Sequence, residues 1–512
     1  MTAIDGTRAG VPATATGQIP APSAVPDQPG GGTPGTPGTP GAPGKDDAGH
    51  SRTGIVLLIL VLGALTYSLL QSMLSPALPV ITREVGTTTD TASWLLTAYL
   101  LVASVTTPVV SRLGDIHGKK KLFVVAIGAL GVGSLICGLA DNISLLIVGR
   151  AIQGVGAAVF PLSFGIVRDE FPPERRAAAI GLTSAVMGIG GGIGSVLAGP
   201  IVDNLSYHWL FWIPMVVCVF TVAMAWKFIP DSPDRAQSTK INWLGAALLA
   251  GALACLLLGV SKGRAWGWGS GTILGLLTTA AVLLVLWVVA EQRSDAPLVD
   301  MRVMRLRGVW TTNVAGLLTG YAMMSAMFLM PQLLQLPKST GFGFGTTVTM
   351  AGVYMLPLAV AMLIAGPTAG ALEARIGSKP SLLGGCVLLG VGSLLLIVAH
   401  GELWQITIGL FVFGLGVGAA MAAMANVIVG AVPPEQTGIA SGINTIARTV
   451  GMSFGSALSM VAVTSHTTSA GVPTESGFTM AFAIAAGAGV LAVVVGVLVP
   501  STRRKAPAKQ VS

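Results

Sequence analysis

Charged residues are scarce in this sequence. Only 10% of its 512 residues are Asp, Glu, Lys or Arg, whereas a soluble domain carries about 25%. Cysteines are also few, and no CxxC pair is present, which argues against a cysteine-based metal or redox site. Each of the four lies in a different apolar run: Cys137, Cys218, Cys255 and Cys386. The shortage of charge argues against a water-soluble protein and favours one that crosses a membrane many times.

Catalytic patterns are missing as well. The sequence contains no HExxH motif, no GxSxG motif and no pair of acids within an apolar run. We therefore expect neither an enzyme nor a bound cofactor or metal ion. The net charge of +8 does not indicate nucleic-acid binding, because almost all lysines and arginines lie between the apolar runs.

Fourteen apolar runs of about 20 residues follow Gly54, each long enough to cross about 30 Å of hydrocarbon as a helix. The sequence therefore predicts an all-α integral membrane protein with 14 transmembrane helices. The runs centre near Leu65, Leu101, Leu130, Ala157, Ile189, Val217, Ala252, Val282, Leu318, Val360, Leu389, Leu415, Thr449 and Gly489.

The basic residues predict the orientation of these helices. If both termini lie on one side, that side collects nearly every loop lysine and arginine, and the opposite side has only Arg83, Lys262, Arg264 and Lys338. Because positive loops stay in the cytoplasm, both termini are expected there.

The first 50 residues differ from the rest, since they include GTPGTPGTPGAPG at 32–44. This composition predicts a disordered cytoplasmic tail, and it is neither a collagen helix nor a signal peptide. The remaining predicted boundaries are an N-terminal six-helix half at 51–230, two inserted spans at 231–300, a C-terminal six-helix half at 301–500 and a basic tail at 501–512.

An internal repeat predicts the two halves. FPPERRAAAIGL at 171–182 resembles VPPEQTGIASGI at 432–443, and the matching residues stand 261 positions apart. Both copies follow spans that end on the same side, so the halves are related as a parallel repeat. The copies lie eight spans apart instead of six, which indicates two extra spans near 241–261 and 272–290.

The segment SRLGDIHGKKK at 111–121 places a dense group of charges between spans 2 and 3. Its Gly-Asp-x-x-Gly-Lys-Lys pattern resembles the signature loop of the major facilitator superfamily, although Ser111 stands where that family has Gly. Gly377 and Lys379 form a degenerate second copy of this pattern between spans 10 and 11. The resemblance covers about residues 54–499, and the 14-span layout is similar to the drug:proton antiporter branch.

This resemblance implies a conformational latch that closes the cytoplasmic side in one state. The residues that it assigns to the latch are Gly114, Asp115, Gly118, Lys119, Lys120, Arg375 and Gly377. An ordinary positively charged hairpin is the alternative interpretation.

A second similarity lies in span 4, where Arg150-x-x-Gln153-Gly154 matches a family motif. The resemblance implies proton linkage or pairing within the membrane for Arg150, and a similar role for Arg448 in span 13; a purely structural anchor is the alternative. Arg150 is expected to face the bundle interior, because an arginine is costly in hydrocarbon.

Span 5 departs from the antiporter pattern, because Ser195 and Ala198 replace its Pro and one Gly. Gly190, Gly194 and Gly199 remain and predict close helix packing. The acid expected in span 1 is also absent, since Leu70 stands at its position. Asp115 and Asp203 are therefore the candidates for proton coupling, and a helix-end role is the alternative for Asp203.

The substrate cavity is expected to use amides, aromatic hydroxyls and flexible methionines, which suit varied and mostly apolar ligands. The candidates are Gln71, Tyr99, Asn313, Met323, Met327, Gln332, Gln335, Tyr354 and Asn444.

Together these features predict a monomeric secondary transporter in a bacterial cytoplasmic membrane, surrounded by lipids. It is expected to export small amphipathic organic compounds by alternating access, with protons as the expected coupling ion. An importer or facilitator of another solute is the alternative, ahead of a membrane enzyme or a channel.

Overall fold

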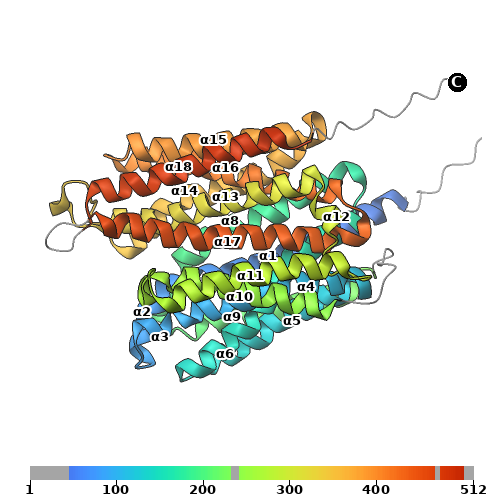
Figure 1. Ribbon diagram of the computed structural model, residues 1–512, viewed down its shortest axis with the longest axis horizontal. Coiled ribbons are helices and arrows are strands. Elements are labelled where there is room, and N and C mark those ends of the chain that lie inside the picture. The colour runs from blue at the N-terminus through green and yellow to red at the C-terminus, as the bar shows by residue number, and fades with distance from the viewer. Residues whose placement is uncertain (1–44, 232–241, 467–472, 501–512) are drawn as a thin grey trace, which may run out of the picture. The chain divides into compact units, whose positions relative to one another are not determined.

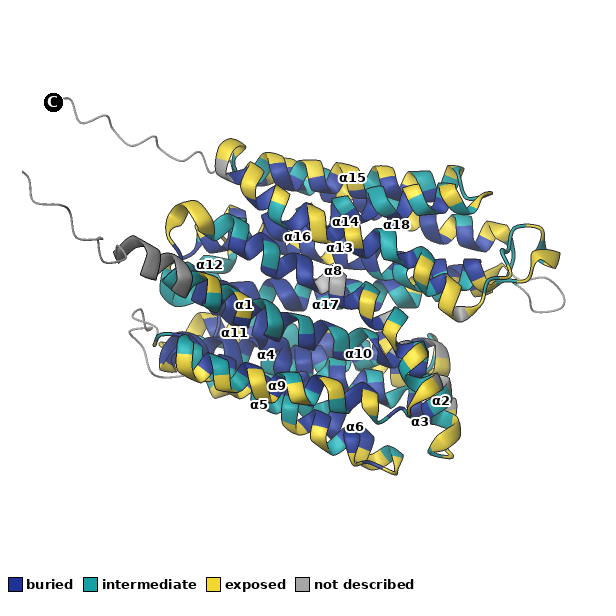
Figure 2. Ribbon diagram, turned by 180° about the vertical axis from the view of Figure 1, so that it is seen from behind, coloured by how far each residue is buried: buried dark blue, intermediate teal, exposed yellow. Residues whose placement is uncertain are grey.

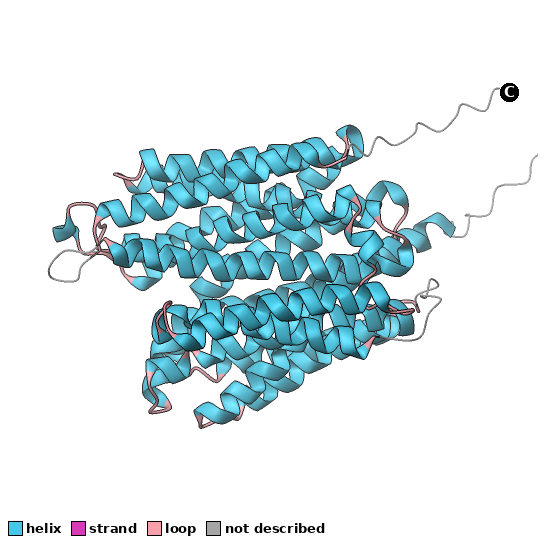
Figure 3. Cartoon of the chain, viewed as in Figure 1, coloured by secondary structure: helices cyan, strands magenta, loops and turns pink. Residues whose placement is uncertain are grey.

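The computed structural model describes residues 45–231, 242–466 and 473–500, which form helices joined by short loops, without a strand (Figure 1; Figure 3). Contacts divide the chain into two units, residues 1–48 and 49–512, and every candidate membrane span belongs to the second. Residues 1–44 of the predicted disordered tail lie outside the described residues, as does the basic tail at 501–512, so both tails stay predictions.

Fourteen segments of the described chain are long and apolar enough to cross a membrane, which confirms the predicted number. The six spans of the N-terminal half are α1 (Lys45–Ser72), α4 (Trp94–His117), α5 (Lys119–Gly138), α6 (Ile143–Gly154) continued by η1 (Val155–Ala158) and α7 (Val159–Glu170), α8 (Pro173–Asn204) and α9 (Trp209–Phe228). The inserted pair is α10 (Trp243–Trp266) and α11 (Gly271–Arg293).

The C-terminal half contains α13 (Arg307–Gln335), α14 (Val348–Ile376), α15 (Ser378–Val398), α16 (Leu403–Ala431), α17 (Thr437–Ser465) and α18 (Glu475–Leu498). Short helices lie in the connections: α2 (Leu74–Glu84), α3 (Thr89–Ala92), α12 (Met301–Met304), η2 (Lys338–Thr340) and η3 (Pro434–Gln436). The predicted domain boundaries stay predictions.

Span 4 is not one continuous α-helix, in contrast to the single run expected from its apolar sequence. Its middle tightens into the 3₁₀ turn η1, at the GVGAA sequence. A Cβ at Gly154 would lie 2.8 Å from the carbonyl oxygen of Tyr99, so the glycine lets this span approach the backbone of α4. Short 3₁₀ stretches within helices often mark hinges.

The two halves meet mainly along four helix pairs: α8–α14, α4–α17, α8–α16 and α7–α17. α8 packs against α14, where Gly370 allows the backbones to approach: a Cβ there would lie 2.5 Å from the carbonyl oxygen of Ala177. Small residues permit such close packing in membranes. α4 packs against α17 in the second pair, and the inserted helix α10 contacts both of them (Figure 1).

Large apolar side chains cover the outward faces of the bundle. Val285, Val398 and Val490 are each more than half exposed, although they lie within candidate spans. Figure 2 shows these exposed stripes alternating with buried faces along the outer helices. Such surfaces suit contact with lipid chains, while the buried faces form the helix–helix core.

Candidate functional site

The charged segment between spans 2 and 3 forms a sharp break between two helices. α4 ends and α5 begins at Gly118, whose φ of 108° lies in the region that only glycine adopts easily. Its N–H donates to the carbonyl oxygen of Gly114 at 3.0 Å. The predicted second copy has the same geometry, because Gly377 has a φ of 90° and its N–H donates to the carbonyl oxygen of Glu373 at 2.9 Å.

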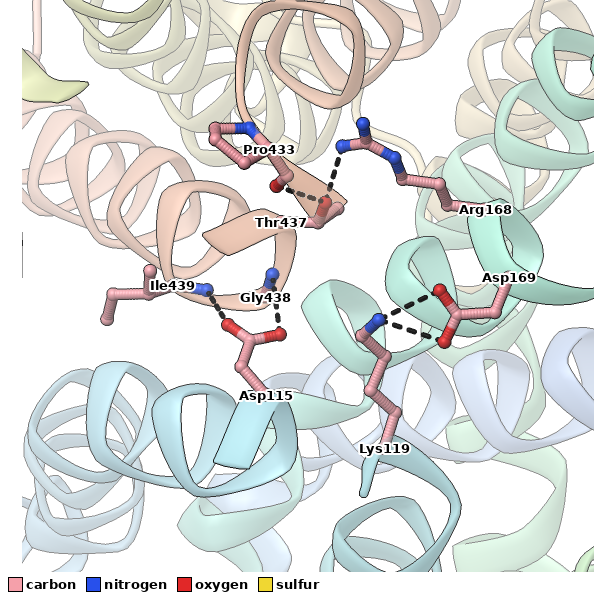
Figure 4. A network of polar contacts seen from close by, with 8 residues as sticks. All are labelled: Asp115, Lys119, Arg168, Asp169, Pro433, Thr437, Gly438 and Ile439. Carbon is pink, nitrogen blue, oxygen red and sulfur yellow. Dashed lines mark hydrogen bonds and ion pairs between the residues drawn. The ribbon is translucent and has the colours of Figure 1, made fainter. Parts of the chain in front are cut away.

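Asp115 reaches from this break into the other half of the molecule. Its buried carboxylate accepts hydrogen bonds from the backbone N–H groups of Gly438 at 3.2 Å and Ile439 at 3.1 Å, at the start of α17 (Figure 4). A helix N-terminus has unpaired N–H groups and a partial positive charge, so it stabilises a carboxylate. The contact therefore links α4 to α17 electrostatically.

Gly438 is needed for this approach. A Cβ at that position would lie 2.8 and 2.9 Å from the two carboxylate oxygens of Asp115. Even alanine would force the carboxylate and the helix apart. Gly438 belongs to the second copy of the sequence repeat, at 432–443. The repeat indicated that this segment lies on the same side of the membrane as the charged loop at 111–121. Nothing in the sequence paired Gly438 with Asp115.

A second link between the halves comes from α7. Arg168 donates to Oγ1 of Thr437 at 2.6 Å (Figure 4). It also donates to the carbonyl oxygen of Val432 at 2.9 Å. Thr437 in turn donates to the carbonyl oxygen of Pro433 at 3.3 Å. Two helices of the N-terminal half, α4 and α7, thus contact the same N-terminus of α17. The sequence indicates only that Arg168 belongs to the positively charged loops, and it does not predict this contact.

Lys119 supports these contacts from within the N-terminal half. Its Nζ lies 2.9 Å from both carboxylate oxygens of Asp169, and the two side chains are 0% and 2% exposed. The pair ties α5 to α7 directly beside Arg168 and Asp115 (Figure 4). Gly165 makes room for the lysine stem, since a Cβ there would lie 2.7 Å from the Cδ of Lys119.

The other predicted latch residues lie away from this inter-half contact. Nζ of Lys120 lies 5.9 Å from the ring centre of Trp226 in α9 and 4.0 Å from Asp231, which follows that helix. Arg375 is exposed at the end of α14. Their latch role stays a prediction.

Arg150 faces the bundle interior and is 0% exposed. Its guanidinium lies 4.2 Å from the ring centre of Tyr99 and donates to the carbonyl oxygens of Leu95 and Leu70, each at 3.2 Å. It also donates to Oε1 of Gln153 at 2.7 Å, and Gln153 donates to Oγ of Ser134 at 2.9 Å. All these acceptors are neutral, so they hold the guanidinium without cancelling its charge.

A narrow cavity lies between the halves, and it is too small for an organic solute. The surrounding side chains come from α1, α4, the η1–α7 region and α17, and they include Arg448. The lining residues are Tyr67, Gln71, Leu100, Ala103, Ser104, Thr107, Ala157, Phe160, Thr445, Ile446, Arg448, Thr449 and Met452.

Of the predicted substrate residues, Gln71 is among the described residues that line this cavity. Tyr99 is outside the lining, and its ring centre lies 5.9 Å from that of the lining residue Tyr67. Asn444 instead joins α17 to α13, donating to the carbonyl oxygen of Thr312 and to Oδ1 of Asn313. The remaining candidates lie on α13 and α14, outside the lining: Met323, Met327, Gln332, Gln335 and Tyr354.

The two amides on α13 show why the sequence did not distinguish these positions. Gln332 and Gln335 donate to backbone carbonyl oxygens one turn earlier, those of Phe328 and Pro331. A polar side chain on a membrane helix can therefore be satisfied by its own backbone. Ser104, which lines the cavity, went unnoticed because an isolated serine carries no signal.

The glycines of span 5 lie against neighbouring helices. Gly190 packs on Ser68 of α1, and its carbonyl oxygen accepts from Oγ of Ser72 at 2.7 Å. Gly194 packs on Ser72, and Gly199 faces Thr349 of α14. Asp203 lies in α8, but its side chain is outside the described residues.

In the described ranges, no three His, Cys, Asp or Glu side chains come together as metal ligands would. Two groups of buried polar residues lie between the halves, one at the contact with the N-terminus of α17 and one at the arginine-containing cavity. This arrangement suits a protein that moves one half against the other around an internal site.

Comparison with known proteins gives a consistent assignment. Residues 60–456 and 312–512 match the family model described as Major Facilitator Superfamily. An uncharacterized MFS-type transporter of Mycobacterium tuberculosis is 32% identical over 413 residues, which cover 79% of this chain and 59% of that protein. The chain thus spans less than two thirds of that relative's length.

Multidrug resistance protein 3 of Bacillus subtilis is 26% identical over 413 residues, covering 80% of this chain and 79% of that protein. The solved structure of a proton:xylose symporter superposes with a TM-score of 0.61 at 14% identity, covering 89% of this chain and 97% of that one. The chain therefore belongs to the Major Facilitator Superfamily.

Proposed function

We propose that this chain is a secondary active transporter that exports small amphipathic organic compounds across a bacterial cytoplasmic membrane. It works by alternating access, with both termini in the cytoplasm and the proton-motive force as the driving force. The similarity to a named multidrug resistance protein supports the export of such compounds. The distribution of loop lysines and arginines supports the orientation.

The observation that carries the mechanism is the contact between Asp115 and the N-terminus of α17. In the proposed orientation this contact lies on the cytoplasmic side, so it closes that side of the cavity. When it breaks, α4 and α17 separate and a solute can enter from the cytoplasm. Arg168 adds a second closing contact, and the Lys119–Asp169 pair holds both in position.

The cavity around Gln71 and Arg448 is the proposed substrate site, in a closed state of the transport cycle. Gly118 and Gly377 are proposed to keep the helix breaks rigid on the two halves. The monomer is proposed as the functional unit, because the cavity and its closing contacts are built from one chain.

Growth and dye efflux test the proposal. The full-length protein is expressed in a bacterial host that lacks its own drug pumps, and cells are challenged with a panel of amphipathic compounds. We expect faster energy-dependent efflux and higher resistance for part of the panel, compared with an Asp115→Ala variant at equal membrane abundance. Compounds that accumulate faster in expressing cells would instead support the importer.

A further inference from the structure

Among the described residues that line the inter-half cavity, the only charged side chain is an arginine. Arg448 lines it and is 6% exposed, and Arg150 is fully buried one layer behind, stacked on Tyr99. None of the lining residues is an aspartate or a glutamate. A guanidinium keeps its proton under all conditions that a protein encounters, so the positive charge of both residues is permanent.

The groups around Arg150 orient it without neutralising it. Its described hydrogen-bond acceptors are the carbonyl oxygens of Leu70 and Leu95 and the amide oxygen of Gln153, all of which are uncharged. Its buried Nη2 makes no hydrogen bond within the described part of the chain. Charges at membrane depth are costly, and the usual compensation is an acidic partner or a charged substrate.

A second hydrogen-bond donor at the cavity also suits a negatively charged ligand. Oγ of Ser104 is buried at the cavity and makes no hydrogen bond within the described residues. By contrast, the nearby hydroxyls of Thr445 and Thr449 donate to backbone carbonyl oxygens of their own helix. Ser104 and Arg448 thus approach the cavity from α4 and α17, that is, from opposite halves.

Apart from Gln71, Thr107 and the hydroxyl of Tyr67, the rest of the lining is apolar. Leu100, Phe160, Ile446 and Met452 surround the polar groups, and Tyr67 packs edge-on against Phe160 with ring centres 5.6 Å apart. Such a lining suits the hydrocarbon or aromatic body of a ligand. An organic cation would meet a permanent positive charge there, and none of the described lining residues would offer it a carboxylate.

We propose that the substrate is an amphipathic organic anion, whose carboxylate or similar headgroup binds Arg448 and Ser104 while its apolar body lies against Phe160 and Leu100. This inference rests on the proposed transport through the cavity and narrows its substrate class. Arg150 acts as a positioning residue, because it holds Tyr99 and adds positive potential without reaching the cavity lining.

Matched dye pairs test the inference. Purified full-length protein is reconstituted in proteoliposomes, and exchange is measured at equilibrium, which requires neither a direction nor an energy source. The first pair is fluorescein, an anion, and rhodamine 6G, a cation with the same xanthene core. The second pair is 2-naphthoate and the N-methylquinolinium cation. Binding is followed in parallel by the shift of Tm in detergent.

We expect both anions to raise the Tm and to exchange, and both cations to do neither. Arg448→Gln should lower anion exchange by about tenfold, the loss expected when one charged hydrogen-bond donor is removed, and Arg448→Lys should restore part of it. Arg83→Gln, a matched change at an exposed arginine at the end of α2, should exchange anions like the wild type.

Three results would overturn the inference: cations that exchange as well as the anions, no binding by either anion, or anion exchange that is unchanged in Arg448→Gln. The experiments can contradict the proposed export and the proposed anion selectivity independently of each other. Anions that exchange in proteoliposomes without net efflux from cells would contradict export alone, whereas net efflux of cations would contradict anion selectivity alone.

Discussion

Removing the carboxylate of Asp115 should open the side of the protein that the proposed orientation places in the cytoplasm. The carboxylate accepts two buried backbone hydrogen bonds, at 3.2 and 3.1 Å, from the N-terminus of α17. A hydrogen bond to a charged group stabilises by about 1.5–3 kcal/mol, and these long bonds belong at the lower end. Their loss should therefore destabilise the closed state by about 3 kcal/mol, which corresponds to about a 100-fold change in the closed-to-open ratio.

The assay is cysteine labelling from the cytoplasmic side. Thr107 lines the cavity and is 1% exposed, so Thr107→Cys in a background without the four native cysteines reports on opening. In inside-out vesicles, a membrane-impermeant maleimide should label it far faster when Asp115 is replaced by Ala. Transport should fall strongly at unchanged membrane abundance, because the variant no longer closes one state.

Asp231→Asn is the matched control, since it removes an exposed carboxylate that lies 4.0 Å from Lys120 and outside the inter-half contact. Its labelling rate should stay within about twofold of the parent, as expected for a surface ion pair of small energy. If Asp115→Ala is labelled at the same rate as the parent and transports normally, the latch is refuted. The charged loop would then serve only to set the orientation of the spans.

Three further predictions follow from the same contacts. Gly438→Ala should increase cytoplasmic labelling of Thr107→Cys as Asp115→Ala does, because its methyl group would collide with the carboxylate; unchanged labelling would contradict the packing. Lys119→Met should lower the free energy of unfolding by about 3–5 kcal/mol, measured as a lower Tm in detergent, because Asp169 is left in a buried site without its lysine. Replacing both residues, as Lys119→Met with Asp169→Leu, should recover part of the loss, and no recovery would argue against the ion pair as the cause. In proteoliposomes with the membrane potential clamped to zero, transport driven by a pH gradient should be lost in Asp115→Asn or in Asp203→Asn. Gradient-driven transport that survives both substitutions would exclude these carboxylates as the coupling groups.

The helical fold and the number of spans were predictable from the sequence because a membrane imposes a strict length on each span, whereas the orientation stays a prediction. Each span must be about 20 apolar residues long, and loop arginines and lysines prefer one side. Arg150 could be placed in the interior for a similar reason, since a guanidinium facing lipid would be too costly. These constraints depend on local composition only.

The pairing of distant segments was not predictable in the same way. Asp115 and Gly438 are more than 300 positions apart, and their contact depends on how two halves dock. The cavity lining was also difficult, because the faces of glycine-rich and alanine-rich spans are hardly distinguished by polarity. Gln332 therefore looked like a substrate contact, although its amide donates to its own helix.

The central claim is that α4 and α17 must separate and rejoin in every transport cycle, and a reversible cross-link between them tests it most directly. A Cβ at Gly442 of α17 would lie 3.5 Å from the Cβ of Ser111 in α4, a distance compatible with a disulfide. The double variant Ser111→Cys with Gly442→Cys should form the cross-link on oxidation, lose transport, and regain it on reduction. Each single variant should be insensitive to oxidation. Transport by the cross-linked protein at the reduced rate would contradict the account.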